Sequence, residues 1–184
     1  MTTASSKTRV ATASPRKKNI GGKMEGRPRG GGGGRTVMDY SLAALKLFAS
    51  QLAGSTTAPS SEGSSPAQML FGIRFQRAWI QGVVVRADYS VGDGRLFVDD
   101  GSCVTELMLR PEDAKGQPWR PGMYVLIIGA YIAPQSTESL PMVKVHKIVD
   151  LSTQPDREAM WYMEVAEAYN FFYKADASGF GSPS

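Results

Sequence analysis

Few side chains in this 184-residue sequence are of the types that perform catalysis or bind metals. His146 is the single histidine, and no second type of metal ligand lies close to it in the sequence. Metal sites and general acid–base catalysis both need several such groups placed together. We therefore expect His146 to be a surface or edge residue of a strand.

Asp99 and Asp100 form an adjacent pair of carboxylates, an arrangement that acid–base catalysis can use. They directly precede Gly101, and Asp is favoured before such tight turns because its carboxylate accepts hydrogen bonds from the local backbone. The glycine run at 30–34 is no phosphate loop, because no Lys-Ser/Thr pair follows it and no strand precedes it. The sequence thus predicts no enzyme, no cofactor, no metal and no small-molecule substrate.

Charge is distributed unevenly along the chain, whose net charge is +4. Residues 1–37 contain nine Lys or Arg and one acid, which gives +8, whereas residues 38–184 carry −4. Residues 1–37 are also poor in large apolar side chains, so we expect a disordered basic tail. The lone cysteine, Cys103, excludes a disulfide framework. No apolar run approaches the ~20 residues of a membrane helix, and the N-terminus lacks the apolar segment of a signal peptide.

One basic cluster in this tail predicts nuclear import, and hence a location in the nucleus. It consists of Arg16, Lys17 and Lys18. An organelle transit peptide is an open alternative, because the first twenty residues contain no acid and many Ser and Thr.

A second cluster resembles the Arg/Gly segments that bind nucleic acid loosely through phosphates. Its basic residues, separated by a glycine run, are Arg27, Arg29 and Arg35. A solvated, flexible tail without a ligand is the alternative interpretation of the same residues.

Five short runs are rich in Val, Ile, Tyr and Phe, the composition that β-strands favour. They cover residues 79–87, 95–99, 104–109, 122–132 and 142–149. Asp93-Gly94 and Asp100-Gly101 join the first three, and Asp-Gly supplies the positive φ of tight hairpins. Gly82, inside the first run, predicts a bulge or sharp bend.

A bent first strand that pairs with both ends of a sheet closes a small barrel and removes its exposed edges. The predicted fold class is therefore all-β with flanking helices, built on a five-stranded OB-fold barrel. The fourth run is apolar on both faces, so we expect its outer face to be covered as well. In the fifth run Ile148 is out of step with Val143 and Val145, which predicts a bulge near His146. The proline-rich loop at 110–121 leaves room for one helical turn.

The predicted organisation in chain order is a disordered basic tail at 1–37, a short helix at 38–52, a flexible linker at 53–68, the OB-fold domain with a C-terminal helix at 69–173, and a disordered tail at 174–184. The short helix is predicted from apolar residues at helical spacing. These are Leu42, Leu45, Ala49 and Leu52.

The C-terminal helix, over 156–173, carries more aromatic surface than one open end of a small barrel needs. Such a surface indicates a protein partner. The stripe and its flanking residues that we expect to bind a partner are Trp161, Val165, Ala168, Phe172, Tyr162 and Tyr169, with Lys147 beside them. The alternative is that Trp161 only plugs the barrel of its own chain.

OB barrels commonly bind single strands on their second and third strands, with stacked aromatics and a positive groove. Here the second strand offers Phe97 and the third none, while Asp99, Asp100 and Glu106 add negative charge. Because an acidic surface repels phosphate, we expect the barrel to bind DNA weakly, with any contact made indirectly or through the tail. The alternative is a single-stranded nucleic-acid-binding protein that uses the Arg/Gly tail directly.

Several blocks of the sequence resemble one known family, RecQ-mediated genome instability protein 2. The blocks are Trp79-Ile-Gln-Gly-Val-Val-Val-Arg-Ala-Asp, Pro121-Gly-Met-Tyr-Val-Leu-Ile-Ile-Gly, Lys147-Ile-Val-Asp-Leu-Ser and Glu158-Ala-Met-Trp-Tyr-Met-Glu-Val. Their order and spacing also match, over residues 76–173, and a weaker block resembles the family at 45–52. The tail and the linker are not part of the family pattern.

The resemblance implies a small OB-fold subunit without enzymatic activity. It implies pairing, through packed C-terminal helices, with an OB domain of a larger sister subunit, as in the middle and small subunits of replication protein A. Through that partner the subunit would serve topoisomerase III and a RecQ helicase. Such a complex resolves recombination intermediates without crossover, in DNA repair and genome stability.

Overall fold

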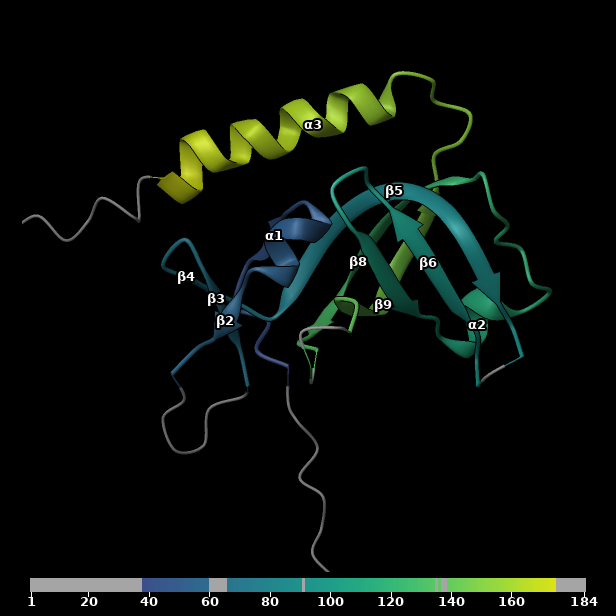
Figure 1. Cartoon of the computed structure of the whole chain (residues 1–184), viewed down its shortest axis with the longest axis horizontal. Coiled ribbons are helices and arrows are strands. Elements are labelled where there is room, and N and C mark those ends of the chain that lie inside the picture. Colours follow the sequence, from purple (N-terminus) through teal and green to yellow (C-terminus); the bar gives the residue numbers. More distant parts are fainter. Residues whose placement is uncertain (1–37, 60–65, 91, 135, 137–138, 175–184) are drawn as a thin grey trace, which may run out of the picture. The chain divides into compact units, whose positions relative to one another are not determined.

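The computed structural model describes residues 38–59, 66–90, 92–134, 136 and 139–174. Its centre is a closed barrel (Figure 1), whose strands are β5 (Arg77–Asp88), β6 (Arg95–Asp99), β7 (Val104–Met108), β8 (Tyr124–Ile132) and β9 (Met142–Asp150). β5, β6 and β7 form a meander, β7 pairs with β9 in parallel, and β9 and β8 are antiparallel. Pairing of β5 with β8 closes the barrel, which confirms the predicted OB-fold.

β5 closes the barrel because its two halves have different neighbours. Its residues from Arg77 to Val83 pair with β8, and those from Val83 to Asp88 pair with β6. The bulge predicted at Gly82 lies instead three residues later, where the register with β6 shifts around Val85. Gly82 has a different role, because a Cβ at this position would lie 2.5 Å from the carbonyl oxygen of Asp99. The strands approach each other too closely there for any side chain.

The second predicted bulge is confirmed. Gly129 of β8 pairs with Val145, whereas the preceding Ile128 pairs with Lys147, so His146 is the extra residue on β9. The bulge changes which residues face inward, and this accounts for the broken alternation of the fifth strand. The barrel interior contains side chains that are buried completely or nearly so, among them Ile80, Val84, Leu96, Leu107, Val125, Ile127, Val143 and Val145.

The prediction of a helix over 38–52 is corrected by the structure. Residues Ala44–Lys46 form a strand, β1, that pairs in parallel with the start of β5, and only Ala49–Ala53 form a helix, α1. Leu45 and Leu47 are both buried while Lys46 between them is partly exposed, which is the alternation of a strand. The helix ends at Ala53, and Gly54 is its C-cap.

Part of the segment expected to be a flexible linker is structured. Thr56–Thr57 (β2) pairs with Gln68–Leu70 (β3), and β3 pairs with Ile73–Phe75 (β4) in a separate three-stranded sheet. This sheet continues directly into β5. The Ser/Thr/Pro composition that suggested a linker does not reveal these backbone pairings, because Thr56 pairs with Met69 and the rest of the sheet lies beyond residue 68.

Two helices complete the described structure. The loop between β7 and β8 contains a single turn, α2 (Pro111–Ala114), as its three prolines predict. After β9 the chain enters α3 (Arg157–Ala168), whose N-cap position is Asp156, and continues into a π-helical turn, η1 (Tyr169–Tyr173). Within the described residues no helix has the length and apolar character needed to cross a membrane.

Candidate partner-binding surface

The helix α3 has one face against the rest of the chain and one face exposed. On the inner face Trp161 and Val165 are each 1% exposed, and Ala168 is 8% exposed. Trp161 and Val165 are not part of the cluster that fills the barrel interior. In Figure 1 α3 (yellow) extends along the outside, next to α1 and the curved part of β5. At Trp161 and Val165 the helix therefore covers the barrel's outer surface, whereas Ala168 and Tyr173 pack into the main hydrophobic cluster.

An ion-pair network fixes the middle of α3. The ammonium group of Lys46 on β1 lies 2.7 Å from the carboxylate of Glu164, which is 3.0 Å from the guanidinium of Arg157. Burial alone would raise the pKa of Glu164, but the hydrogen bond from Lys46 and the two positive charges lower it below its ordinary value. Glu164 is thus held charged between two cations.

The same lysine contacts two indole rings. Its ammonium lies 4.8 Å from the ring centre of Trp79 on β5 and 6.0 Å from that of Trp161 on α3. Trp79 is the register partner of Lys46, so both side chains lie on the outer face of the sheet. Cation–π attraction therefore adds to the ion pair in holding α3 to the barrel.

The end of α3 is held by aromatic contacts. Phe71, at the tip of the β3–β4 hairpin, lies 5.0 Å from the ring of Tyr169 and 6.0 Å from that of Tyr173. Phe71 has a φ of +53°, the left-handed region that a bulky residue adopts only at a cost of ~1–3 kcal/mol. This backbone conformation places the aromatic ring of Phe71 in contact with η1.

The middle of α3 also contacts the β6–β7 turn. The hydroxyl of Tyr162 donates a hydrogen bond to the backbone carbonyl of Asp100 at 2.8 Å, and its ring lies 5.3 Å from that of Phe48. Burial, and then the charge of Glu158 on α3, raises the pKa of Tyr124 at the start of β8.

The carboxylates of Asp99 and Asp100 accept hydrogen bonds from the backbone of the β6–β7 turn, as the sequence indicated. Asp100 accepts hydrogen bonds from the backbone N–H of Ser102 at 2.9 Å and from that of Ala49, at the start of α1, at 2.7 Å. Asp99 accepts one from the N–H of Gly101 at 2.8 Å. Both carboxylates are thus engaged by the backbone, and Asp100 ties α1 to the barrel.

The exposed side of α3 and η1 carries large apolar side chains together with the polar Glu158, Glu167 and Asn170. The exposed apolar residues are Met160, Met163, Phe171 and Phe172, with exposed fractions of 43, 59, 71 and 68%. We call these four residues the outward face. They are large apolar side chains left exposed on a helix that is already anchored by its other side, and such exposure is typical of a protein–protein contact.

The residues predicted to bind a partner fall into two groups in the structure, one buried and one exposed. Trp161, Val165 and Ala168 are buried against their own chain, whereas Tyr162, Tyr169 and Phe172 are 42, 38 and 68% exposed. Lys147 is exposed on β9, where it pairs with Ile128 of β8. In this conformation only the second group and Lys147 are accessible to another protein. Three residues of the outward face were not among the predicted site residues: Met160, Met163 and Phe171.

Comparison with known sequences identifies the family. The profile described as RecQ-mediated genome instability protein 2 matches residues 43–169. This chain belongs to that family. A curated member from Bos taurus, also described as RecQ-mediated genome instability protein 2, is 31% identical over 110 residues. The alignment covers 59% of this chain and 66% of the bovine protein, slightly less than two thirds of its length.

Solved structures support the fold of this RecQ-mediated genome instability protein 2 family member. A chain of the S. pombe Stn1–Ten1 complex has a TM-score of 0.60 at 18% identity and covers 73% of this chain and 96% of its own. A chain of a replication protein A heterotrimer bound to single-stranded DNA has a TM-score of 0.55 at 14% identity, covering 70% and 97%. At these identities the likeness concerns the fold alone.

The barrel face that binds single strands in other OB-folds has its charges paired in this family member. Arg95 forms an ion pair with Glu106, and Arg86 forms one with Asp88 at 2.9 Å. The guanidinium of Arg86 also lies 5.1 Å from the ring of Phe97. The basic residues of this face thus have acidic partners within the barrel.

The remaining predicted sites lie elsewhere. The import candidates Arg16, Lys17 and Lys18 and the candidate nucleic-acid contacts Arg27, Arg29 and Arg35 fall outside the described residues. Within the described part of the chain, no group of three or more His, Cys, Asp or Glu is arranged to hold a metal ion.

Proposed function

We propose that this chain is a non-catalytic OB-fold scaffold subunit that pairs with a larger OB-fold partner. Through that partner it would stabilise a complex of a RecQ helicase and topoisomerase III in the nucleus. The complex would act in homologous recombination and DNA repair, in the dissolution of recombination intermediates. Membership of the RecQ-mediated genome instability protein 2 family supports the cellular role, and the outward face of α3 supports the pairing.

The outward face carries the proposal because the chain itself offers it no cover in the described residues. Met163 and Phe171 are more than half exposed, although α3 is held firmly by Trp161 and Glu164. A partner helix laid against the outward face would bury large apolar side chains without displacing these contacts. Burial of such side chains contributes ~1.5–3 kcal/mol each, which is the scale of interface hot spots.

The test is co-purification of the tagged full-length chain with its co-expressed OB-fold partner. Met163→Glu places a charge in the middle of the outward face and is expected to weaken the complex at least thirtyfold, which corresponds to ~2 kcal/mol. Isothermal titration calorimetry measures this loss. Val85→Glu is the matched control, because Val85 is 47% exposed and lies on the barrel at the β5 bulge.

A retained wild-type affinity of Met163→Glu would refute the outward face as the partner contact. Loss of binding in both variants would point to a general effect of charge or folding. The melting temperature of each variant alone separates these cases, because both changes are at exposed positions and are expected to leave it within a few degrees of wild type.

Direct binding of single-stranded DNA is the second candidate function. The Arg86 guanidinium over the Phe97 ring offers a cation and an aromatic face together, and the sequence of residues 1–37 adds +8. Fluorescence anisotropy with labelled oligo-dT tests it in the full chain and after removal of residues 1–37. Tight binding that survives this removal, with a Kd well below ~10⁻⁵ M at physiological salt, would favour this second function.

A further inference from the structure

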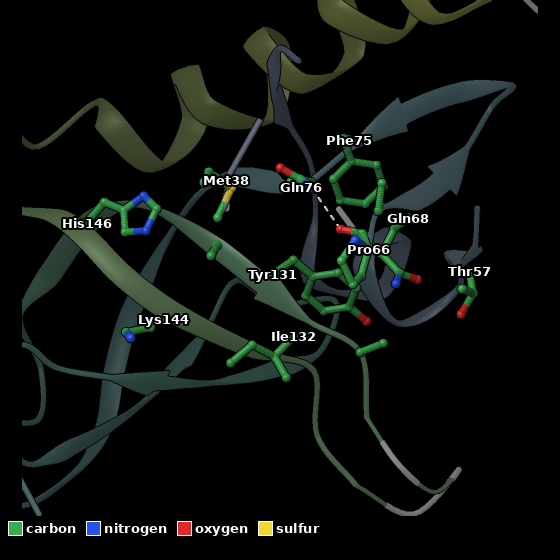
Figure 2. Close-up of a pocket in the computed structure, with 13 residues that line it drawn as sticks. Met38, Thr57, Pro66, Gln68, Phe75, Gln76, Tyr131, Ile132, Lys144 and His146 are labelled. Carbon is green, nitrogen blue, oxygen red and sulfur yellow. Dashed lines mark hydrogen bonds between the residues drawn. The ribbon is translucent and has the colours of Figure 1, made fainter. Parts of the chain in front are cut away.

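A groove lies between the small β2–β3–β4 sheet and the ends of β8 and β9, as Figure 2 shows. Its volume is about 730 Å³, within the ~300–1,000 Å³ range of typical ligand sites. It shares no residue with the outward face of α3. The roles described above for the barrel and the helix do not use this groove.

Hydrogen bonds hold the walls of the groove in place. The side-chain amide of Gln76 donates to the carbonyl of Pro66 at 2.8 Å and accepts from the N–H of Asp39 at 2.7 Å. The backbone N–H of Tyr131 donates to the carbonyl of Gln76 at 2.9 Å, and the hydroxyl of Tyr131 to that of Leu52 at 2.9 Å. The groove is therefore preformed, which lowers the entropic cost of binding a ligand.

The floor of the groove is apolar. Phe75 and Tyr131 stack with an interplanar angle of 15° and are 0% and 9% exposed, and Ile132 at the rim is 40% exposed. Because both rings are buried, neither presents a free face on which a nucleic-acid base could stack. An aliphatic or aromatic side chain inserted over Ile132 would instead bury apolar surface.

Among the lining residues that the structure describes, Lys144 is the charged side chain, and none of them is Asp or Glu. Lys144 and His146 lie on the side opposite to Thr57 and Gln68 (Figure 2). Burial, and then the positive charges of Arg77, Arg110 and Lys144, lowers the pKa of His146. The ammonium group of Lys144 would therefore attract an anionic group to this end of the groove.

We propose that this groove binds a short peptide segment of another protein, in which an apolar side chain is followed closely by Asp or Glu. The apolar side chain lies on the floor beside Ile132, and the carboxylate reaches Lys144 and His146. The chain's own N-terminal segment has the wrong charge for this role, because residues 1–37 contain nine bases and a single acid.

The probe is a phage-displayed library of random nine-residue peptides, selected on the full-length chain at 150 mM salt. Enriched peptides are then labelled with fluorescein and measured by anisotropy. We expect them to share an apolar residue with Asp or Glu within the next few positions. Ile132→Ser and Lys144→Glu should each weaken them at least tenfold, since the first removes the rim contact and the second reverses the charge.

Two control variants separate the groove from general electrostatics and from the basic tail. Lys115→Glu makes the same change of charge at an exposed position after α2, and Val85→Ser removes an apolar side chain of similar exposure. Both should leave peptide affinity within twofold of wild type. Circular dichroism and melting temperature confirm that all four variants are folded.

Three outcomes would overturn the proposal. Selection that yields no peptide above background would do so, as would enriched peptides that bind Lys144→Glu or Ile132→Ser as tightly as wild type. The third is a fluorescein-labelled twelve-residue oligo-dT whose binding depends on Lys144 while peptide binding does not, which would assign the positive end to nucleic acid. None of these results bears on the pairing through the outward face, which is measured separately with Met163→Glu.

Discussion

The hydroxyl of Tyr173 bonds to both backbone polar groups of Lys46. It accepts from the N–H at 2.9 Å and donates to the carbonyl at 3.3 Å. The last turn of the helical region is thereby tied to β1, the first strand of the described chain. Burial, opposed by the hydrogen bond from Lys46, raises the pKa of this tyrosine above its ordinary value, so the neutral hydroxyl is the form that makes these contacts.

Removal of this hydroxyl should loosen the C-terminal end of the helix. We expect Tyr173→Phe to lower the free energy of unfolding by about 1–2 kcal/mol, because the backbone groups of Lys46 lose their partner. Urea denaturation measures the loss. Tyr169→Phe is the control, since the described structure gives the hydroxyl of Tyr169 no hydrogen bond, and a loss of equal size in both variants would contradict the assigned role of Tyr173.

Trp161 should contribute to the stability of the isolated chain. Because it is 1% exposed against its own barrel, we expect Trp161→Ala to lower the free energy of unfolding by ~3–5 kcal/mol. Trp161→Phe keeps most of the packing and removes an indole nitrogen that has no hydrogen-bond partner in the described structure, so it should cost much less. An isolated Trp161→Ala chain with a wild-type denaturation curve would show that this residue instead serves a partner.

Asp100 should be more important to the fold than Asp99. Asp100→Ala leaves the N–H groups of Ala49 and Ser102 without their acceptor, and we expect a loss of about 2–3 kcal/mol in the free energy of unfolding. Asp99→Ala removes a single hydrogen bond at an exposed turn and should cost about 1 kcal/mol or less. Hydrogen exchange of the Ala49 amide reports directly on the lost contact.

His146 should make stability depend on pH near neutrality. The pKa of His146 is lowered in the folded chain from its ordinary 6.5, so the unfolded chain takes up a proton first as the pH falls. The stabilisation is complete above pH 6.5 and is lost as the pH falls through the folded pKa. Because this is the only histidine, His146→Gln should flatten the stability profile between pH 7.5 and 5; an unchanged profile would contradict the burial of this side chain.

The barrel could be predicted because its signals are local. The Asp-Gly turn at Asp100 and the β-favouring composition of each strand act within a few residues, and the bulge at His146 appeared directly as a break in the alternation of the fifth strand. The strand β1 could not be predicted in the same way. Three residues of alternation also fit a helix, and the partner strand that decides between them begins at Arg77, 33 positions away from Ala44.

The partner-binding residues were harder to predict for a related reason. A helical stripe such as Trp161, Val165 and Ala168 has the same pattern whether it packs on its own barrel or on another protein. What decides between these is the ion pair of Lys46 with Glu164, residues 118 positions apart, and no local pattern reveals such a pairing. The exposure of Met160 and Met163 can be predicted only once the buried face of α3 is known.

The tie between Tyr173 and Lys46 joins residues 127 positions apart, which has a consequence for synthesis. At ~5–20 residues per second, about 1–5 s separate the translation of the end of β9 from that of Tyr173. A chain that ends within this interval has the strands of the barrel but not its helix, and the outer face around Trp79 is uncovered. A chain terminated within this interval would retain that apolar face permanently, so nonsense or frameshift products ending after β9 should be captured by chaperones or aggregate.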